Sequence, residues 1–216
     1  KKKNIPAILQ QSPTRIWIGT EGGGLFLYNP QTGTIKNYSH TSKTANCISS
    51  DYVRSLALDS QHRLWIGTIN SLNIYNEQED NFNIYTSDPL ENGSLSQMSV
   101  RNIFMDTQGG MWLGTYFGGI NYYHPLKNRF RNLQFTAKPN SLNSNIINCI
   151  REDAQKGLWI GTNGGGVNYY NPQTGKFTHY TQKEGLGSND VKAIYIDEAN
   201  KQVYIGTHTG GLSILH

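Results

Sequence analysis

The 216-residue chain contains a tetrapeptide that recurs five times at nearly constant intervals. It reads Trp-Ile-Gly-Thr from Trp17, Trp65 and Trp159, Trp-Leu-Gly-Thr from Trp112, and Tyr-Ile-Gly-Thr from Tyr204. Successive starts lie 48, 47, 47 and 45 residues apart. A repeat of this length indicates one structural unit copied along the chain, whose copies must stack to bury a continuous core.

Aspartates and glycine-rich turns recur together with the tetrapeptide. An aspartate stands six or seven residues before four of the copies, and Gln11 takes its place before the first. The four aspartates are Asp59, Asp106, Asp153 and Asp197. We expect them to form tight turns. Since no calcium-loop pattern surrounds them, we expect no calcium site.

Each unit is expected to hold four short strands. In the second unit, β-rich or alternating runs cover residues 53–58, 64–68, 72–76 and 82–85. No segment has a sustained 3.6-residue period, so no helices are expected. The prediction is an all-β fold, a β-propeller of four-stranded antiparallel blades with five repeats of about 47 residues.

The blades are predicted at approximately 4–40, 52–86, 99–135, 146–181 and 190–216, the last lacking its outer strand. These ranges favour an arc of a larger propeller of about seven blades, and a closed five-bladed ring is the alternative.

Composition excludes several classes of protein. The net charge is +4, but Lys1, Lys2 and Lys3 supply three of these charges, and the near-neutral remainder does not suit nucleic acid. No apolar run is long enough to span a bilayer, so we expect no membrane contact by this segment. Cys47 and Cys149 lie in different blades and are not expected to pair. We expect no metal and no cofactor.

The run from Asp153 to Pro172 and the lead-in segments from Asn140 to Asn145 and from Gly93 to Gln97 resemble the two-component regulator propeller repeat. The resemblance recurs five times and covers essentially the whole chain. It implies the periplasmic sensor region of a hybrid two-component system, anchored in the inner membrane and joined in the parent protein to a histidine kinase and a response regulator. It also implies oligosaccharide ligands and a homodimeric receptor.

The turn between the second and third strands is the first candidate site. We place it on the same face as the link into the next blade, where binding residues commonly vary on a constant scaffold. Varied aromatic, amide and other polar side chains occupy it: Glu21, Asn70, Tyr116, Phe117, Asn163 and His208. Aromatic rings stack on sugars and amides pair with hydroxyls. Ordinary loop variation or a contact with a neighbouring domain is the alternative.

A second candidate set lies early in the inner strands, at Arg54, Arg101, Asn148 and Lys192, with Pro6 in the first unit. These side chains are expected to line the central channel and to favour an anionic or hydroxyl-rich ligand. Channel side chains that are paired or hydrated are the alternative interpretation.

Three functions compete. The first is a sensory binding module, and the second is a non-catalytic protein-interaction or dimerisation scaffold. The third is a propeller glycosidase or lyase, which would need two carboxyl groups facing a cleft. The expected inner strands carry almost no acids, and the six histidines share no spacing typical of zinc sites. We therefore expect this segment not to be an enzyme.

Overall fold

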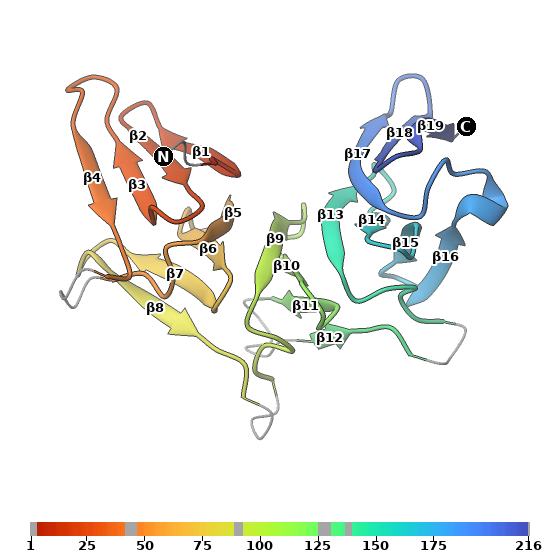
Figure 1. The fold of residues 1–216 in the computed structure, drawn as a ribbon, viewed down its shortest axis with the longest axis horizontal. Helices are drawn as coiled ribbons and strands as arrows, with labels where there is room; N and C mark the ends of the chain where they lie inside the picture. Colours follow the sequence, from red (N-terminus) through yellow and green to blue (C-terminus); the bar gives the residue numbers. More distant parts are fainter. Residues whose placement is uncertain (1–3, 42–46, 89–92, 125–130, 137–139, 216) are drawn as a thin grey trace. The chain divides into compact units, whose positions relative to one another are not determined.

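A computed structural model describes residues 4–41, 47–88, 93–124, 131–136 and 140–215. They form five antiparallel sheets and one 3-10 turn, Gln182–Glu184 (Figure 1). The predicted all-β repeat of four-stranded blades is thereby confirmed. Among the described residues, no helix is long and apolar enough to cross a bilayer.

Within each sheet the strands follow the order of the sequence. The first sheet contains β1 (Ala7–Ser12), β2 (Arg15–Gly19), β3 (Leu25–Tyr28) and β4 (Ile35–Tyr38). The second contains β5 (Val53–Leu58), β6 (Leu64–Thr68), β7 (Leu72–Asn76) and β8 (Asn81–Tyr85). The third contains β9 (Val100–Met105), β10 (Met111–Thr115), β11 (Ile120–Tyr123) and β12 (Arg131–Leu133).

The fourth sheet contains β13 (Ile147–Glu152), β14 (Leu158–Thr162), β15 (Val167–Asn171) and β16 (Lys176–Tyr180). The fifth contains three strands, β17 (Val191–Asp197), β18 (Gln202–Thr207) and β19 (Gly211–Leu215). The chain divides into two compact units, Lys1–Leu113 with Tyr123–Phe130, and Gly114–Tyr122 with Arg131–His216.

The tetrapeptide forms the second strand of each sheet. Strands β6, β10 and β14 are buried at every residue, because both faces of these strands are covered. The threonine that ends the motif donates its hydroxyl to the carbonyl that closes the next turn. These bonds are Thr20 to Gly24, Thr68 to Ser71, Thr115 to Gly119, Thr162 to Gly166 and Thr207 to Gly211, at 2.8–3.0 Å. The motif therefore builds both a core strand and its turn.

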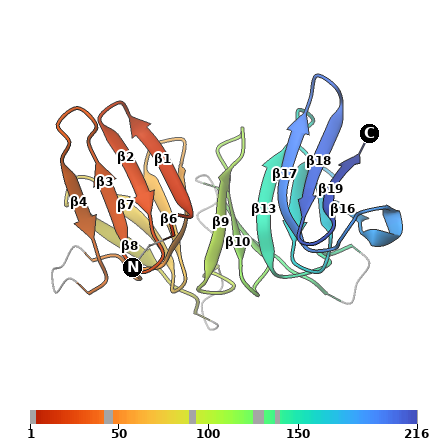
Figure 2. The same cartoon turned by 45° about the horizontal axis from the view of Figure 1, so that its top comes forward.

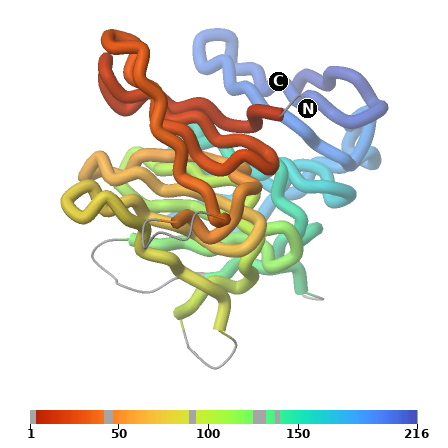
Figure 3. The backbone as a smooth tube through the Cα atoms, turned by 60° about the vertical axis from the view of Figure 1, so that its left-hand side comes forward, coloured from red at the N-terminus to blue at the C-terminus, as the bar shows by residue number. Residues whose placement is uncertain are grey.

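In the first unit, the first two sheets pack face to face (Figures 2 and 3). Trp17 is fully buried between them, and the ring of Tyr75 from the second sheet lies with its centroid 5.0 Å away. Trp65 repeats the arrangement with Tyr123, at 5.4 Å. In the second unit, Trp159 joins the core between the fourth and fifth sheets. Trp17, Trp65 and Trp159 thus each pack against the sheet that follows in the chain. The rings of the first two meet their tyrosines at an angle, as aromatic pairs prefer.

The repeated aspartates do more than form turns. In three of them, Oδ2 accepts a hydrogen bond from the indole N–H of the tryptophan six residues later. The distances are 2.9 Å for Asp59, 2.7 Å for Asp106 and 3.0 Å for Asp153. Gln11 supplies the same acceptor to Trp17 at 2.8 Å. Since a buried indole N–H needs a partner, the acceptor explains the constant six-residue spacing, which the sequence analysis attributed to turns alone.

Asp197 is the exception among the aspartates. Its carboxylate accepts hydrogen bonds from the backbone and side chain of Asn200, at 3.1 and 2.8 Å. Tyr204 replaces tryptophan in this sheet, and its hydroxyl donates to Gln202 at 2.8 Å.

Candidate functional site

Each sheet has two ends of different character. We call the end with the Asp59, Asp106, Asp153 and Asp197 turns the aspartate end. The opposite end, with the turns between second and third strands and the links between blades, is the link end. In the first unit, the backbone N–H groups of Gly22 and Gly24 donate to Asp51 of the link, at 2.9 and 3.0 Å. In the second unit Gly166 donates to Asn189 at 2.9 Å. The structure confirms that turn and link share one face.

The first residue of each link-end turn occupies an equivalent backbone position. In four blades its N–H donates to a carbonyl shortly before the inner strand of the same blade. The bonds are Glu21 to Asn4, Ile69 to Tyr52, Asn163 to Ile146 and His208 to Asp190, at 2.7–3.2 Å. Tyr116 takes the same place in the sequence, directly after the threonine of the motif. The variable position therefore holds Glu21, Ile69, Tyr116, Asn163 and His208.

Asn70 does not belong to this equivalent set. The β6–β7 turn is one residue shorter than the others, so Asn70 is its second residue and its backbone N–H bonds to the Thr68 hydroxyl at 3.2 Å. Its side chain is nevertheless exposed at the link end. Sequence comparison of the copies missed Ile69, which the shortened spacing between Thr68 and Leu72 could have revealed.

Tyr116 and Phe117 form an exposed aromatic pair on the β10–β11 turn. Their ring centroids lie 4.1 Å apart in an edge-to-face arrangement, and the side chains are 39% and 57% exposed. The turn below them is well anchored, because Gly118 N–H donates to the Thr115 hydroxyl at 2.9 Å and Gly119 N–H to Asn145 at 3.2 Å. A firmly held turn thus presents two apolar rings to solvent.

Two cations of the inner-strand set are paired. Arg54 lies at a register irregularity of β5 and forms an ion pair with Glu21, whose other oxygen accepts from Asn4 at 3.0 Å. Lys192, at the corresponding irregularity of β17, pairs with Asp190 at 2.8 Å. The structure thus brings together members of both predicted sets, Glu21 and Arg54.

Asn148 contributes a further contact near Asp190. Its amide donates to the Val191 carbonyl at 2.7 Å and approaches Asp190 at 3.4 Å. Asp190 is a partner that the sequence analysis missed, and its position beside Lys192 in the chain was the available signal. Arg101 is the second residue of β9 and is half-buried. For Arg54 and Lys192, the ion pairs agree with the alternative interpretation of the inner-strand set, in which the channel side chains are paired or hydrated.

The cysteines and the possible metal ligands were the remaining candidates for reactive groups. Burial raises the pKa of the Cys149 thiol to about 11, which disfavours the reactive thiolate. Cys47 and Cys149 are both free. Within the described ranges, no group of three or more histidine, cysteine, aspartate or glutamate residues is placed to hold a metal ion.

Comparisons with known proteins agree with this architecture. A family model described as a two component regulator propeller matches residues 47–70, 94–117 and 141–164. Each match runs from a link through the inner two strands to the link-end turn. A histidine kinase of Formosa agariphila is 31% identical over 65 residues, which cover 30% of this chain and 5% of the kinase.

Solved structures share the fold. The extracellular domain of a protein assigned as a hybrid two component system in B. thetaiotaomicron superimposes with a TM-score of 0.85 at 25% identity. The match covers 100% of this chain and 29% of that one. PorZ, a surface component of the type-IX secretion system of Porphyromonas gingivalis, gives a TM-score of 0.51 at 18% identity over 95% of this chain and 38% of PorZ, which shows the fold alone. The chain therefore spans less than a third of the first relatives that it matches.

Proposed function

Because three repeats of this chain match the two-component regulator propeller model, we propose that the chain is the ligand-sensing propeller of a hybrid two-component sensor. The ligand in this proposal is an oligosaccharide, bound at the link end. The parent receptor is a homodimer anchored in the inner membrane, and this segment lies in the periplasm. The likeness to an extracellular domain and to a histidine kinase supports the assignment.

The exposed pair of Tyr116 and Phe117 is the observation that carries the ligand proposal. Burying such a ring would stabilise the fold by about 1.5–3 kcal/mol, so a rigid turn that exposes two of them lacks a folding rationale. Apolar groups exposed together often mark binding surfaces. Asn163 and His208 occupy the equivalent turn positions in the same compact unit and supply hydrogen-bonding groups suited to hydroxyls.

A binding role also agrees with the structural hydrogen bonds that the repeated aspartates make. The carboxylates of Asp59, Asp106 and Asp153 are each occupied by an indole N–H and by backbone donors of their own turn. Glycosidase chemistry would require two carboxyl groups that face a bound sugar. The proposal therefore assigns recognition, and not catalysis, to this segment.

An interaction scaffold is the second candidate function. Exposed apolar side chains on the first and last sheets favour it, with Ile8 66% and Leu212 63% exposed. Two faces of this kind suit contacts with other protein surfaces.

A glycan array probed with the 216-residue chain, followed by analytical ultracentrifugation, separates these two functions. Sensing predicts saturable binding to a restricted set of oligosaccharides. Absence of glycan binding together with concentration-dependent self-association would favour the scaffold and contradict the sensing proposal. Release of shortened products from the array glycans would contradict the assignment of recognition without catalysis.

A further inference from the structure

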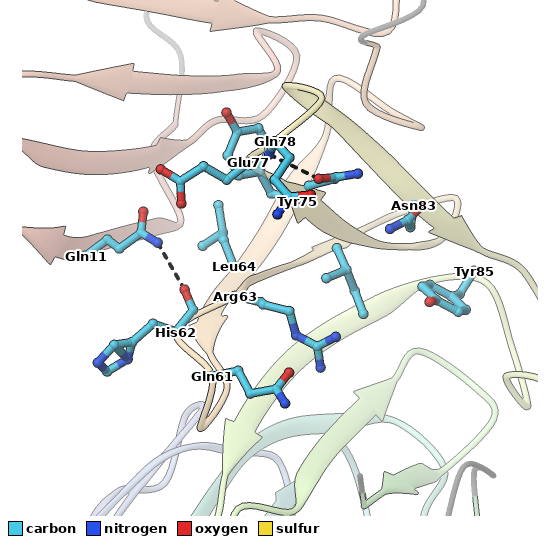
Figure 4. A pocket seen from close by; sticks show the side chains of 12 residues that line it. Gln11, Gln61, His62, Arg63, Leu64, Tyr75, Glu77, Gln78, Asn83 and Tyr85 are labelled. Atoms are coloured by element: carbon cyan, nitrogen blue, oxygen red, sulfur yellow. Dashed lines mark hydrogen bonds between the residues drawn. The ribbon is translucent and has the colours of Figure 1, made fainter.

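A pocket of about 380 Å³ lies at the aspartate end of the first compact unit. Its walls come from the end of β1, the β5–β6 turn and the β7–β8 hairpin (Figure 4). This volume falls within the range of small-molecule sites. The pocket is at the opposite end of the blades from the proposed link-end site.

Arg63 projects into this pocket from a turn that is held in place. The turn passes through His62 at a φ of 59°. Asp59, only 3% exposed, accepts the backbone N–H of Arg63 at 2.9 Å and its Nε–H at 2.7 Å. The guanidinium is therefore held at Nε. Neither of its two terminal nitrogens has a partner among the described residues.

The charge of Asp59 is largely occupied within the turn. Its carboxylate also accepts the backbone N–H of Gln61 and the indole N–H of Trp65, both at 2.9 Å. Glu77, which also lines the pocket, is paired with Arg15. Arg63 forms an ion pair with Asp59 through Nε, and its two terminal nitrogens keep the geometry to bind a carboxylate through two hydrogen bonds.

Neutral hydrogen-bonding groups line the same pocket. The side chains of Gln61, Asn83 and Tyr85 line the pocket, and none of them has a side-chain partner in the part of the chain that the structure describes. Figure 4 shows Gln61 and Arg63 extending from the same turn, with Asn83 and Tyr85 on β8. Tyr85 is 43% exposed and offers a ring face and a hydroxyl. Amides and phenols pair well with sugar hydroxyls.

The second compact unit has a pocket at the corresponding place with different charge. It has a volume of about 430 Å³ and is lined by Asp153, Asp197, Glu198 and Lys201. Gln202 stands two residues before Tyr204 there, as Arg63 stands two residues before Trp65. The second pocket thus has an uncharged side chain at the sequence position that Arg63 takes in the first.

We propose that the pocket around Arg63 binds a carboxylate-bearing sugar, whose carboxylate is held by the Arg63 guanidinium and whose hydroxyls bond to Gln61, Asn83 and Tyr85. The site is independent of the link-end proposal, because it lies at the other end of the blades and shares no residue with it. Its ligand class follows from a guanidinium that Asp59 holds in place with its terminal nitrogens open, in a pocket also lined by amides and a phenol.

Isothermal titration calorimetry of the 216-residue chain with sodium D-galacturonate tests this site, with D-galactose and sodium acetate as comparison ligands. Galacturonate should bind saturably and more tightly than both. Arg63→Gln should weaken binding at least about tenfold, since it removes a charge-assisted pair, whereas Arg63→Lys should have an intermediate effect. Gln202→Ala is the matched control in the second unit and should leave the affinity unchanged.

Because Arg63 also bonds to Asp59, Asn83→Ala provides a variant outside that turn and should weaken binding severalfold. Phe117→Ala should leave galacturonate binding unchanged, so failure of either site is distinguishable from failure of the other. No saturable binding, equal binding of galactose or acetate, or equal affinity of wild type and Arg63→Gln would each overturn the proposal.

Discussion

The indole Nε1–H of Trp65 donates a hydrogen bond to Oδ2 of Asp59 at 2.9 Å, and both residues are almost completely buried. This bond joins the turn between the first two strands to the largest side chain of the core. The same bond recurs at Asp106 and Asp153, which ties the repeated sequence directly to the repeated fold.

Asp59→Ala should lower the free energy of unfolding by about 3 kcal/mol, because it leaves a buried indole N–H and two backbone N–H groups without their acceptor. Urea unfolding followed by tryptophan fluorescence measures this loss. Asp197→Ala is the control, since Asp197 accepts from Asn200 and no tryptophan. It should cost less than about 1 kcal/mol, and equal losses in the two variants would contradict the role given to the indole bond.

Gly24→Ala and Gly33→Ala should differ in stability although both glycines have a positive φ, 78° and 70°. A Cβ built on Gly24 would overlap the Tyr38 carbonyl oxygen, whereas nothing lies within 4 Å of one built on Gly33. Gly33→Ala should therefore cost only the conformational term of about 1–2 kcal/mol, and Gly24→Ala should cost more. Thermal unfolding of both variants gives the comparison, and a larger loss for Gly33→Ala would show that the link-end turn is not closely packed.

Acid should lower the folding stability of the first compact unit by protonating Asp80. Burial opposes ionisation of this carboxyl group, but hydrogen bonds from Lys36, Tyr38 and Tyr75 outweigh it and lower the pKa from 3.8 to about 2. Because the pKa of Asp80 is lower in the folded protein than in the unfolded chain, the ionised carboxylate stabilises the fold. This stabilisation is complete above the unfolded-chain pKa near 4 and is lost as the pH falls through about 2.

Urea unfolding at a series of pH values between 4 and 2 measures this effect. Asp80→Asn is a suitable variant because asparagine tolerates the φ of 53° at this position. The stability of wild type should fall more steeply with acid than that of the variant. Parallel pH dependences would show that the Asp80 cluster contributes nothing to folding.

Local sequence rules predicted the repeated elements and missed the contacts that join them. The spacing of Trp17, Trp65, Trp112 and Trp159 was enough to place the buried second strands, since periodicity reports on elements that stack in the same way. The pair of Glu21 and Arg54 is separated by 33 residues and forms where β5 has a register irregularity, which reorients the arginine side chain. Propensity and spacing carry no information on such an irregularity.

The aspartate end shows the same limit. A turn role for Asp59 follows from the residue type, but its bond to Trp65 depends on the depth at which the indole packs against the following sheet. Arg63 stood in a turn with no recognisable motif, so the pocket around it became visible only in three dimensions.

Recognition of an oligosaccharide by the link-end aromatic pair can be tested by calorimetry on the Tyr116→Ala/Phe117→Ala double variant. The titrant is the oligosaccharide that the wild-type chain binds best on the array. Tyr195→Ala is the control, since it removes an exposed aromatic ring elsewhere in the same compact unit. The double variant should bind at least about tenfold more weakly, as expected for the loss of two stacking contacts, while Tyr195→Ala should bind as wild type does. Unchanged affinity in a folded double variant would show that the pair does not bind the oligosaccharide.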